Sequence, residues 1–223
     1  MLTLSPEEIS GIGMTSQRTR NRMTSRLRES GIVDERVLYT MATVPRHLFV
    51  DEAMASRAYE DVSLPIGEGQ TISQPYAVAR MTELLLSDGG VNKVLEVGTG
   101  SGYQAAVLSR LVDTVFSVER VQSLLTRARR KFRALGYHNI HVRYTDGSWG
   151  WASHGPFDAI MVTAAPHTVP APLLNQLAVG GKMIIPVGRE DSQTLTVIRR
   201  TRQGFEESQH NDVRFVPFLA GKT

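Results

Sequence analysis

The segment at residues 94–102 constrains the fold more than any other part of this chain. It runs Val-Leu-Glu-Val-Gly-Thr-Gly-Ser-Gly, so a short strand-like stretch leads directly into three glycines at alternate positions. A strand that passes through a glycine-rich turn into a helix is typical of nucleotide-binding α/β folds, because glycines let a ligand lie against the backbone. We therefore expect a parallel sheet with a cofactor site at the end of this strand.

Strand and helix patterns alternate on both sides of this turn. Helices of the length seen between the strands imply parallel crossovers, so we expect an α/β fold with a doubly wound, mostly parallel Rossmann-like sheet. Residues 194–198 and 213–216 have no helix between them and are expected to pair antiparallel at one edge. The expected parallel strands are residues 94–97, 115–118, 140–144, 159–162 and 182–186, and the helices among them are residues 103–111, 121–135 and 172–177.

The N-terminal third contains helix patterns before the first of these strands. Helices are expected from Ser5-Pro6, a serine cap followed by proline, and over residues 17–30 and 34–43. The two glycines and the one proline within residues 59–74 fit neither period, so this segment is expected to form a shaped loop, after which a helix begins at Pro75. We divide one compact domain into a helical cap with an active-site loop (1–75), a cofactor-binding core (76–190) and C-terminal edge strands that contribute to the substrate site (191–223).

Composition excludes several classes of protein. The 223 residues are 41% hydrophobic and include no cysteine, which excludes disulfide scaffolds, thiolate metal sites and cysteine nucleophiles. The six histidines lack metal-ligand spacing, so no metal is expected. No apolar run approaches the length of about 20 residues that spans a membrane, and Glu7 and Glu8 occupy positions where a secretory signal is basic or apolar. We expect a cytoplasmic protein without membrane contact.

Acidic residues lie at the ends of three expected strands, where such folds bind a nucleoside. Glu119 ends the second strand, in position to accept hydrogen bonds from ribose hydroxyls, and Asp146-Gly147 ends the third, where an aspartate accepts a bond from the adenine amine. The glycine spacing is G-x-G-x-G, whereas dinucleotide-binding folds use G-x-G-x-x-G. Glu96, just before the turn, also favours S-adenosyl-L-methionine, because a carboxylate there helps to orient the turn and the methionine end of the ligand.

With their flanks, these residues resemble the class I S-adenosylmethionine-dependent methyltransferases, and more narrowly the protein-L-isoaspartate O-methyltransferases. The narrower similarity lies in residues 64–75, Leu-Pro-Ile-Gly-Glu-Gly-Gln-Thr-Ile-Ser-Gln-Pro, and in residues 156–166, Pro-Phe-Asp-Ala-Ile-Met-Val-Thr-Ala-Ala-Pro. It continues in Gly180-Gly181, in residues 186–188 and in residues 213–217, Val-Arg-Phe-Val-Pro. The similarity runs from about residue 22 to residue 218, and the Gly-Gln-Thr-Ile-Ser loop is specific to that family.

The resemblance implies a protein repair methyltransferase. Such an enzyme transfers a methyl group from S-adenosyl-L-methionine to the free carboxyl of L-isoaspartyl residues in damaged proteins and peptides, and leaves S-adenosyl-L-homocysteine. The methyl ester then collapses to a succinimide, part of which reopens as L-aspartate. Two departures stand out: Thr145 occupies a position where the family usually has glycine, and residues 1–17 lie outside the similarity without an assigned role.

The site residues follow from the motifs and from the resemblance together. The resemblance assigns Ser73 as the active-site serine and residues 213–218 as the segment that holds the substrate peptide. The expected substrate contacts are Thr71, Ile72, Ser73, Val216 and Pro217, and the expected cofactor contacts are Gln70, Thr71, Ser73, Gln74, Glu96, Gly98, Gly100, Ser101, Gly102, Glu119, Arg120, Asp146, Gly147 and Thr163.

The implied chemistry requires no general base. A substrate carboxylate has an ordinary pKa of about 4 and is ionised at neutral pH. We expect the neutral Ser73 hydroxyl to orient one carboxylate oxygen rather than to activate it. Trp149 and Trp151 are interpreted mainly as packing residues, and residues 44–49, Val-Pro-Arg-His-Leu-Phe, as the hinge between the cap helices.

Three other functions stay open at this point. A nucleic-acid methyltransferase suits the arginine clusters at residues 18–28 and 127–133, but solvated helix faces are the preferred explanation, because no aromatic residues lie between the arginines of residues 18–28. The fourth strand also ends in Thr163-Ala164-Ala165-Pro166, whereas enzymes that methylate base amines usually present Asn/Asp-Pro-Pro-aromatic. An NAD-dependent oxidoreductase lacks its glycine spacing, and a binding protein without catalysis is disfavoured by Ser73 and its loop. We expect a monomer whose partners do not include nucleic acid.

Overall fold

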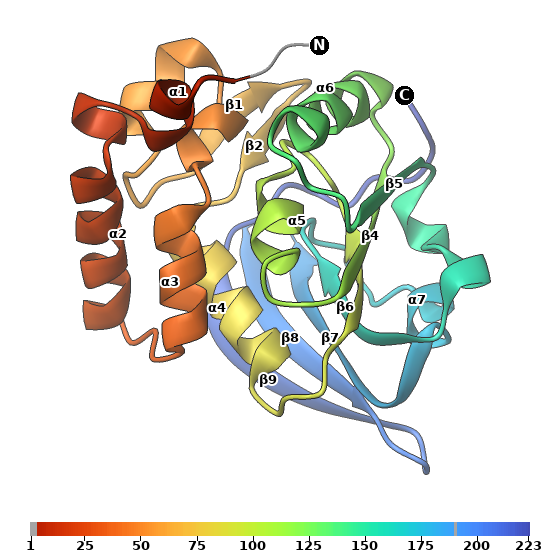
Figure 1. Ribbon diagram of the computed structural model, residues 1–223. Helices are drawn as coiled ribbons and strands as arrows, with labels where there is room; N and C mark the ends of the chain where they lie inside the picture. The colour runs from red at the N-terminus through yellow and green to blue at the C-terminus, as the bar shows by residue number, and fades with distance from the viewer. Residues whose placement is uncertain (1–3, 190) are drawn as a thin grey trace.

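The computed structural model describes residues 4–189 and 191–223 of the chain. Residues 1–3, at the start of the expected cap, and Glu190, at the end of the expected core, lie outside the described residues. A seven-stranded sheet of order β5-β4-β3-β6-β7-β8-β9 forms the centre, and a separate hairpin of β1 (Leu64–Gly67) and β2 (Gln70–Ile72) lies beside it (Figure 1). The large sheet contains β3 (Lys93–Val97), β4 (Thr114–Glu119), β5 (Ile140–Tyr144), β6 (Phe157–Val162), β7 (Leu177–Arg189), β8 (Ser192–Arg200) and β9 (Phe205–Val213).

The order of the strands in the sheet determines where a ligand site is expected. The chain runs from β3 to β4 to β5 on one side and then returns to β6 on the other side of β3, and all of these neighbours pair in parallel, as does β7 with β6. Strands β8 and β9 continue the sheet antiparallel. The expected doubly wound, mostly parallel sheet with an antiparallel edge is therefore confirmed. The direction of winding changes at β3, and ligands bind at the carboxyl ends of strands at such a point.

Both faces of the sheet are covered. Val94 and Val115 point into one apolar cluster with three helices, while Leu95 and Phe116, one residue further on, point into the opposite cluster. Burial on both faces explains why these strands are apolar runs without alternation. One face packs against α4 (Pro75–Leu86), α5 (Tyr103–Leu108) and α6 (Gln122–Ala134). The other is covered by α7 (Ala171–Leu174) and by Trp151, which lies between the 3₁₀ turns η4 (Gly147–Trp149) and η5 (Ala152–His154).

The N-terminal cap shares the first of these clusters. Helices α2 and α3 lie side by side and contact α4 (Figure 1), and their apolar residues belong to the same buried cluster as the sheet. Arg20 donates to the carbonyls of Ile9 and Ser10, and His47 bonds to the carbonyl of Glu8 at 2.8 Å, so the described N-terminal residues pack on the cap. The cap comprises α1 (Pro6–Ser10), η1 (Gly13–Thr15), α2 (Gln17–Glu29), α3 (Glu35–Thr43), η2 (Arg46–Phe49) and η3 (Glu52–Arg57).

The expected shaped loop at residues 59–74 was partly wrong, because it contains the hairpin of β1 (Leu64–Gly67) and β2 (Gln70–Ile72). Leu64 and Ile72 pair across it and are buried. Gly67, Glu68 and Gly69 all have positive φ, so the turn required the glycines that hid two very short strands from the periodicity analysis.

The expected C-terminal edge was wrong in its second strand. The partner of β8 is β9 at Phe205–Val213, not residues 213–216. The sequence of β9 is Phe-Glu-Glu-Ser-Gln-His-Asn-Asp-Val, and the strand is largely exposed, so it lacks the apolar alternation that identifies a half-buried strand. The expected helix at residues 172–177 is also shorter, since α7 ends at Leu174 and Leu177 already begins β7.

Candidate active site

The turn after β3 forms the floor of the candidate site. Gly98, Gly100 and Gly102 have φ of 100°, 52° and 90°, in the region that residues with a side chain rarely adopt. A Cβ atom at Gly98 would lie 2.4 Å from the Thr163 hydroxyl oxygen, so only glycine fits there. The N–H of Gly98 donates to the Val118 carbonyl at 2.9 Å, which ties the turn to β4. At Gly98 and Gly100 the backbone of the turn therefore faces the pocket without a side chain in between.

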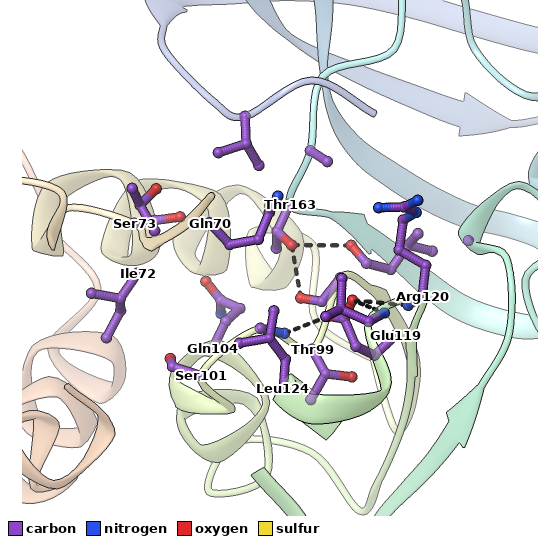
Figure 2. A pocket seen from close by; sticks show the side chains of 18 of the residues that line it. Gln70, Ile72, Ser73, Thr99, Ser101, Gln104, Glu119, Arg120, Leu124 and Thr163 are labelled. Atoms are coloured by element: carbon purple, nitrogen blue, oxygen red, sulfur yellow. Dashed lines mark hydrogen bonds between the residues drawn. The ribbon is translucent and has the colours of Figure 1, made fainter. Parts of the chain in front are cut away.

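Glu119, the last residue of β4, is held by three backbone N–H groups. Its Oε2 accepts from Gly100 at 2.8 Å, and its Oε1 accepts from Arg120 at 2.8 Å and from Val121 at 2.9 Å (Figure 2). These bonds fix the carboxylate in one orientation at the wall of the pocket. A carboxylate has about four acceptor positions, so this one keeps capacity for a ligand hydroxyl.

A pocket of about 850 Å³, partly open to solvent, lies above the turn at the carboxyl ends of the central strands. Figure 2 shows Ile72 and Ser73 on one side of it and Glu119 and Arg120 on the other. The expected site residues that line it are Gln70, Thr71, Ile72, Ser73, Gly98, Gly100, Ser101, Glu119, Arg120, Gly147, Thr163, Val216 and Pro217.

The β1-β2 hairpin brings Gln70 to Ser73 over one side of the pocket. Helix α6 holds the hairpin near its turn: Arg127 donates to the Ile66 carbonyl at 2.6 Å, and Ser123 donates to the Glu68 carboxylate at 2.6 Å. The wall that carries Ser73 is therefore supported by the helix that follows β4.

Residues 216–219 close another side of the pocket. The Ala165 N–H donates to the Val216 carbonyl at 2.8 Å, and the Phe218 N–H donates to the Ala165 carbonyl at 2.9 Å. Pro217 makes an isolated parallel bridge with Ala165. The segment expected to form an edge strand thus crosses the ends of the central strands instead, where Val216 and Pro217 line the pocket.

Four of the expected cofactor contacts lie outside the pocket lining, namely Gln74, Glu96, Gly102 and Asp146. Gln74 occupies the N-cap position of α4, and its side chain makes no capping hydrogen bond with the described residues. A Cβ atom at Gly102 would lie 2.7 Å from the Phe132 ring on α6, so packing between helices requires this glycine.

Glu96 is fully buried beneath the turn. Its Oε2 is hydrogen-bonded to the Ser117 hydroxyl, which lies 2.6 Å from the Thr99 hydroxyl, and its Oε1 has no hydrogen-bond partner among the described residues. Burial raises the pKa of Glu96 to about 8, so the side chain is mostly protonated at neutral pH. The side chain expected to act as a carboxylate near the methionine end therefore supports the turn from inside as a neutral acid.

Asp146 is bonded to the C-terminal segment. Its Oδ1 accepts from the Ser148 N–H at 2.8 Å, and its Oδ2 accepts from the Gly221 N–H at 2.5 Å. Burial raises the pKa of Asp146, but the bonds from Gly221 and Ser148 outweigh it and hold the pKa below its usual value. Gly147, the next residue, does line the pocket, and a Cβ atom there would lie 2.7 Å from Val97.

Sequence reasoning missed much of the apolar lining. The apolar members have the periodicity of ordinary core residues, and their position beside the glycine turn or the acidic strand ends was the only signal available. Gln104 donates to the Thr82 hydroxyl at 3.0 Å, from a helix that the motif analysis did not treat as part of the site. Outside residues 213–218, which were expected to hold the substrate peptide, the lining residues that were not expected are Val78, Val97, Thr99, Tyr103, Gln104, Val118, Val121, Leu124, Ala164 and Leu219.

These residues fit a nucleoside that carries a polar chain. Glu119 offers oriented acceptors for ribose hydroxyls, and Val97, Val118 and Leu124 offer an apolar surface for a purine. Gly98 and Gly147 present bare backbone where any side chain would collide with the protein itself. Within residues 4–189 and 191–223, no group of three or more His, Cys, Asp or Glu side chains is arranged to hold a metal ion. None of the helices in the described part of the chain has the length and apolarity needed to cross a membrane.

Comparison with known sequences identifies close relatives. The family model described as Protein-L-isoaspartate(D-aspartate) O-methyltransferase (PCMT) matches residues 18–223. A protein-L-isoaspartate O-methyltransferase of Halorhodospira halophila is 57% identical over 212 residues, which cover 95% of this chain and 96% of the relative. One from Stenotrophomonas maltophilia is 57% identical over 221 residues, which cover 99% of this chain and 97% of the relative.

Two solved structures have the same fold over most of the chain. One, a protein-L-isoaspartate O-methyltransferase, superposes with a TM-score of 0.81 at 30% identity, and the match covers 89% of this chain and 65% of that longer chain. The other is a putative protein-L-isoaspartate O-methyltransferase from Plasmodium falciparum in complex with S-adenosyl-L-homocysteine. It superposes with a TM-score of 0.79 at 26% identity, over 90% of this chain and 98% of that chain.

Proposed function

Because this chain belongs to the protein-L-isoaspartate(D-aspartate) O-methyltransferase family, we propose that it methylates the free carboxylate of L-isoaspartyl residues in damaged proteins and peptides, with S-adenosyl-L-methionine as donor. Membership of the family confirms the resemblance found in residues 64–75 and 156–166. The observation that carries the proposal is the family match over residues 18–223, which includes every residue that lines the pocket.

The cofactor assignment rests on the pocket and on the relative solved with S-adenosyl-L-homocysteine, the product of methyl transfer. Glu119 would accept hydrogen bonds from the ribose hydroxyls, and the backbone of Gly98 to Ser101 would hold the methionine portion. Arg120 and Gly147, which also line the pocket, would lie beside the adenine. When bound, the donor supplies a sulfonium-linked methyl group, which the substrate carboxylate oxygen attacks in line.

Ser73 orients the substrate carboxylate in this proposal. It lies on the opposite side of the pocket from Glu119, where the acceptor must enter to meet the methyl group (Figure 2). A hydroxyl that donates to one carboxylate oxygen leaves a lone pair of the other oxygen directed at the methyl carbon. A cationic clamp would instead stabilise the ground-state anion more than the transition state, in which the charge has been lost.

The walls of the pocket contribute by limiting water. The reaction brings together an anion and a cation whose charges disappear in the transition state, so a less polar surrounding favours it. Ile72 and Val216 are apolar, and together with Pro217 they flank the place where the peptide backbone enters. Collapse of the methyl ester to a succinimide is intramolecular chemistry of the product and needs no residue of this chain.

A matched pair of peptides tests the proposed function. We expect methyl label from S-adenosyl-L-methionine to enter a peptide with L-isoaspartate at one position, and not the same peptide with L-aspartate there. The measurement is base-labile methanol released after incubation. Absence of label in both peptides, with S-adenosyl-L-homocysteine still bound in calorimetry, would contradict the acceptor assignment and leave the cofactor assignment intact.

The role of Ser73 is tested by Ser73→Ala. We expect kcat to fall by about 10- to 100-fold, because loss of orientation is felt in the transition state. Steady-state kinetics with the isoaspartyl peptide give kcat and KM separately. The control is Ser63→Ala, at an exposed serine just before the hairpin, which should leave both constants unchanged. A raised KM with unchanged kcat would show that Ser73 only binds the peptide.

We also propose that the protein acts as a cytoplasmic monomer. Light scattering of the eluted protein with and without S-adenosyl-L-homocysteine measures the mass, and the expected value is that of one chain. A dimer mass would overturn the monomer assignment.

A further inference from the structure

Arg46 connects the cap to the active-site wall. It begins the 3₁₀ turn η2, in the segment that sequence analysis interpreted as a hinge, and its side chain is fully buried. Its Nε donates to the Ala58 carbonyl at 2.7 Å, and its Nη2 donates to the Ser73 carbonyl at 2.7 Å. One guanidinium therefore joins three segments of the chain at the residue that faces the substrate.

The surroundings of Arg46 are unusual for a buried cation. No described acidic side chain forms an ion pair with it, and its Nη1 is buried without a hydrogen-bond partner among the described residues. The guanidinium carbon lies 4.8 Å from the centroid of the Tyr103 ring, so cation–π attraction replaces part of the lost hydration. Burial lowers the pKa of Arg46, although an arginine still keeps its charge.

If Arg46 served only the stability of the fold, a buried guanidinium without an ion-pair partner would be an unfavourable choice. Taking a charge out of water is strongly unfavourable unless it is paired, and both N–H groups of Nη1 are left without a partner among the described residues. Carbonyl groups in a cap are more simply satisfied by backbone turns or water. A planar group with donors in a fixed fork has one particular advantage, which is that it sets the relative positions of two carbonyls.

Tyr103 connects Arg46 to the part of the pocket that lies beside the glycine turn. Its ring faces Arg46, packs edge-on against Phe49 at 5.6 Å between centroids, and lines the pocket directly after the glycine turn. Arg46 therefore touches both the wall that carries Ser73 and the first residue of α5. These two walls must keep their spacing if the acceptor oxygen is to meet the methyl group.

We propose that Arg46 is a positioning residue for methyl transfer, which acts through the Ser73 carbonyl to hold the Ser73 hydroxyl at a fixed place relative to the cofactor. The inference rests on the proposed function of Ser73. It assigns the buried arginine of the cap to the reaction, where the sequence motif suggested only a hinge.

The first test separates catalysis from stability. We expect Arg46→Met to lower kcat by about 10- to 100-fold with a smaller change in KM, since a displacement near 1 Å at a reacting group has an effect of that size. Arg46→Lys keeps a donor that reaches one carbonyl and should recover part of the loss. The affinity for S-adenosyl-L-homocysteine, measured by calorimetry, should change less than threefold, which shows that the variants are folded.

Arg26 offers a matched control. Its guanidinium also donates to a backbone carbonyl of the same loop, that of Tyr59 at 2.7 Å, but Arg26 is exposed and touches neither Ser73 nor the pocket. Arg26→Met should lower thermal stability while leaving kcat unchanged. If Arg46→Met and Arg46→Lys lower kcat no more than Arg26→Met does, Arg46 has only a structural role and the inference is wrong.

A double-mutant cycle tests the route through Ser73. If Arg46 acts by placing the Ser73 hydroxyl, then Arg46→Lys should lower kcat in the native background and by less than twofold in the Ser73→Ala background. Full multiplication of the two effects would overturn the inference. A Ser73→Ala variant with native kcat would refute the role of Ser73 and this inference with it. If Ser73→Ala lowers kcat while the Arg46 variants keep the native kcat, this inference is refuted and the role of Ser73 stands.

Discussion

At the scale of single residues, the function depends on carboxylates whose environments differ. Glu119 accepts three backbone N–H bonds and faces the pocket, whereas Glu96, on the neighbouring strand, is sealed beneath the turn. Both were predicted as cofactor contacts from their place at strand ends. Their side chains point to the same face of the sheet, because Glu96 pairs with Ser117 and Glu119 follows two residues later. What separates them is their place along the strand: Glu119 is the last residue of β4, whereas Glu96 lies one residue before the end of β3, beneath the turn.

We predict that Glu119→Gln weakens S-adenosyl-L-homocysteine binding by about 10- to 100-fold. Hydrogen bonds to a charged acceptor contribute roughly 1.5–3 kcal/mol each. The carboxylate of Glu119 accepts hydrogen bonds from backbone N–H groups, whereas the amide of glutamine would also direct N–H donors of its own at them. Isothermal calorimetry measures the dissociation constant.

Glu83 provides the control for this prediction. It is a buried carboxylate of α4 that likewise accepts two backbone N–H bonds, from Val33 at 2.7 Å and Asp34 at 2.9 Å in the cap, and it lies outside the pocket lining. Glu83→Gln should lower stability and leave the affinity unchanged. Equal affinities of the Glu119→Gln variant and the native protein would contradict the ribose assignment.

At the scale of elements, the β1-β2 hairpin is the part of the site with the least support of its own. It has two short strands, and a two-stranded hairpin is marginally stable in water by itself. The contacts of Arg127 and Ser123 with it supply attachment from α6. Element order along the chain does not indicate this contact, because the hairpin and α6 are separated by more than fifty residues.

Removal of the Arg127 attachment should loosen the hairpin. We predict that Arg127→Met raises the dissociation constant of S-adenosyl-L-homocysteine about two- to tenfold, the equivalent of one hydrogen bond of roughly 0.5–1.5 kcal/mol. Hydrogen exchange of residues 64–72 should accelerate at the same time. Arg130→Met, at an exposed position of the same helix, is the control. Native exchange in the Arg127→Met hairpin would show that α6 does not stabilise it.

At the scale of the whole molecule, Glu96 lies at the centre of the sheet, on a strand flanked by β4 and β6. Burial raises its pKa from the ordinary 4.5 to about 8. Between these values the folded chain holds a proton that the unfolded chain releases. Rising pH therefore favours the unfolded state, and the contribution of this group to stability is complete below pH 4.5 and lost by about pH 8.

We predict that Glu96→Gln removes this pH dependence. Relative to the variant, the free energy of unfolding of the native protein should fall by up to about 1.4 kcal/mol per pH unit between about pH 5 and pH 8. Urea denaturation at a series of pH values measures both proteins. Parallel stability profiles across this range would mean that Glu96 is not held neutral in the folded protein.

The sequence by itself determined the strand, the glycine turn and the acidic strand end that bind a nucleoside, along with the parallel sheet and the family. Each of these is encoded within a few consecutive residues, or by repeated burial on both faces of a sheet. The sequence did not predict β9, because its residues are polar and show no apolar alternation. It did not predict β1 and β2 either, because these strands are too short to show a period.

Only the tertiary structure decided which side chains meet at the pocket. The contact of Arg46 with Ser73, the crossing of Val216 and Pro217 over the strand ends, and the bond from Gly221 to Asp146 all join residues far apart in the chain. Such contacts depend on strand order and on how the cap packs, which are properties of the whole buried core. No local sequence pattern encodes these contacts. The motif at residues 44–49 was therefore interpreted as a hinge, and only the structure shows that Arg46 donates to the Ser73 carbonyl in the wall of the active site.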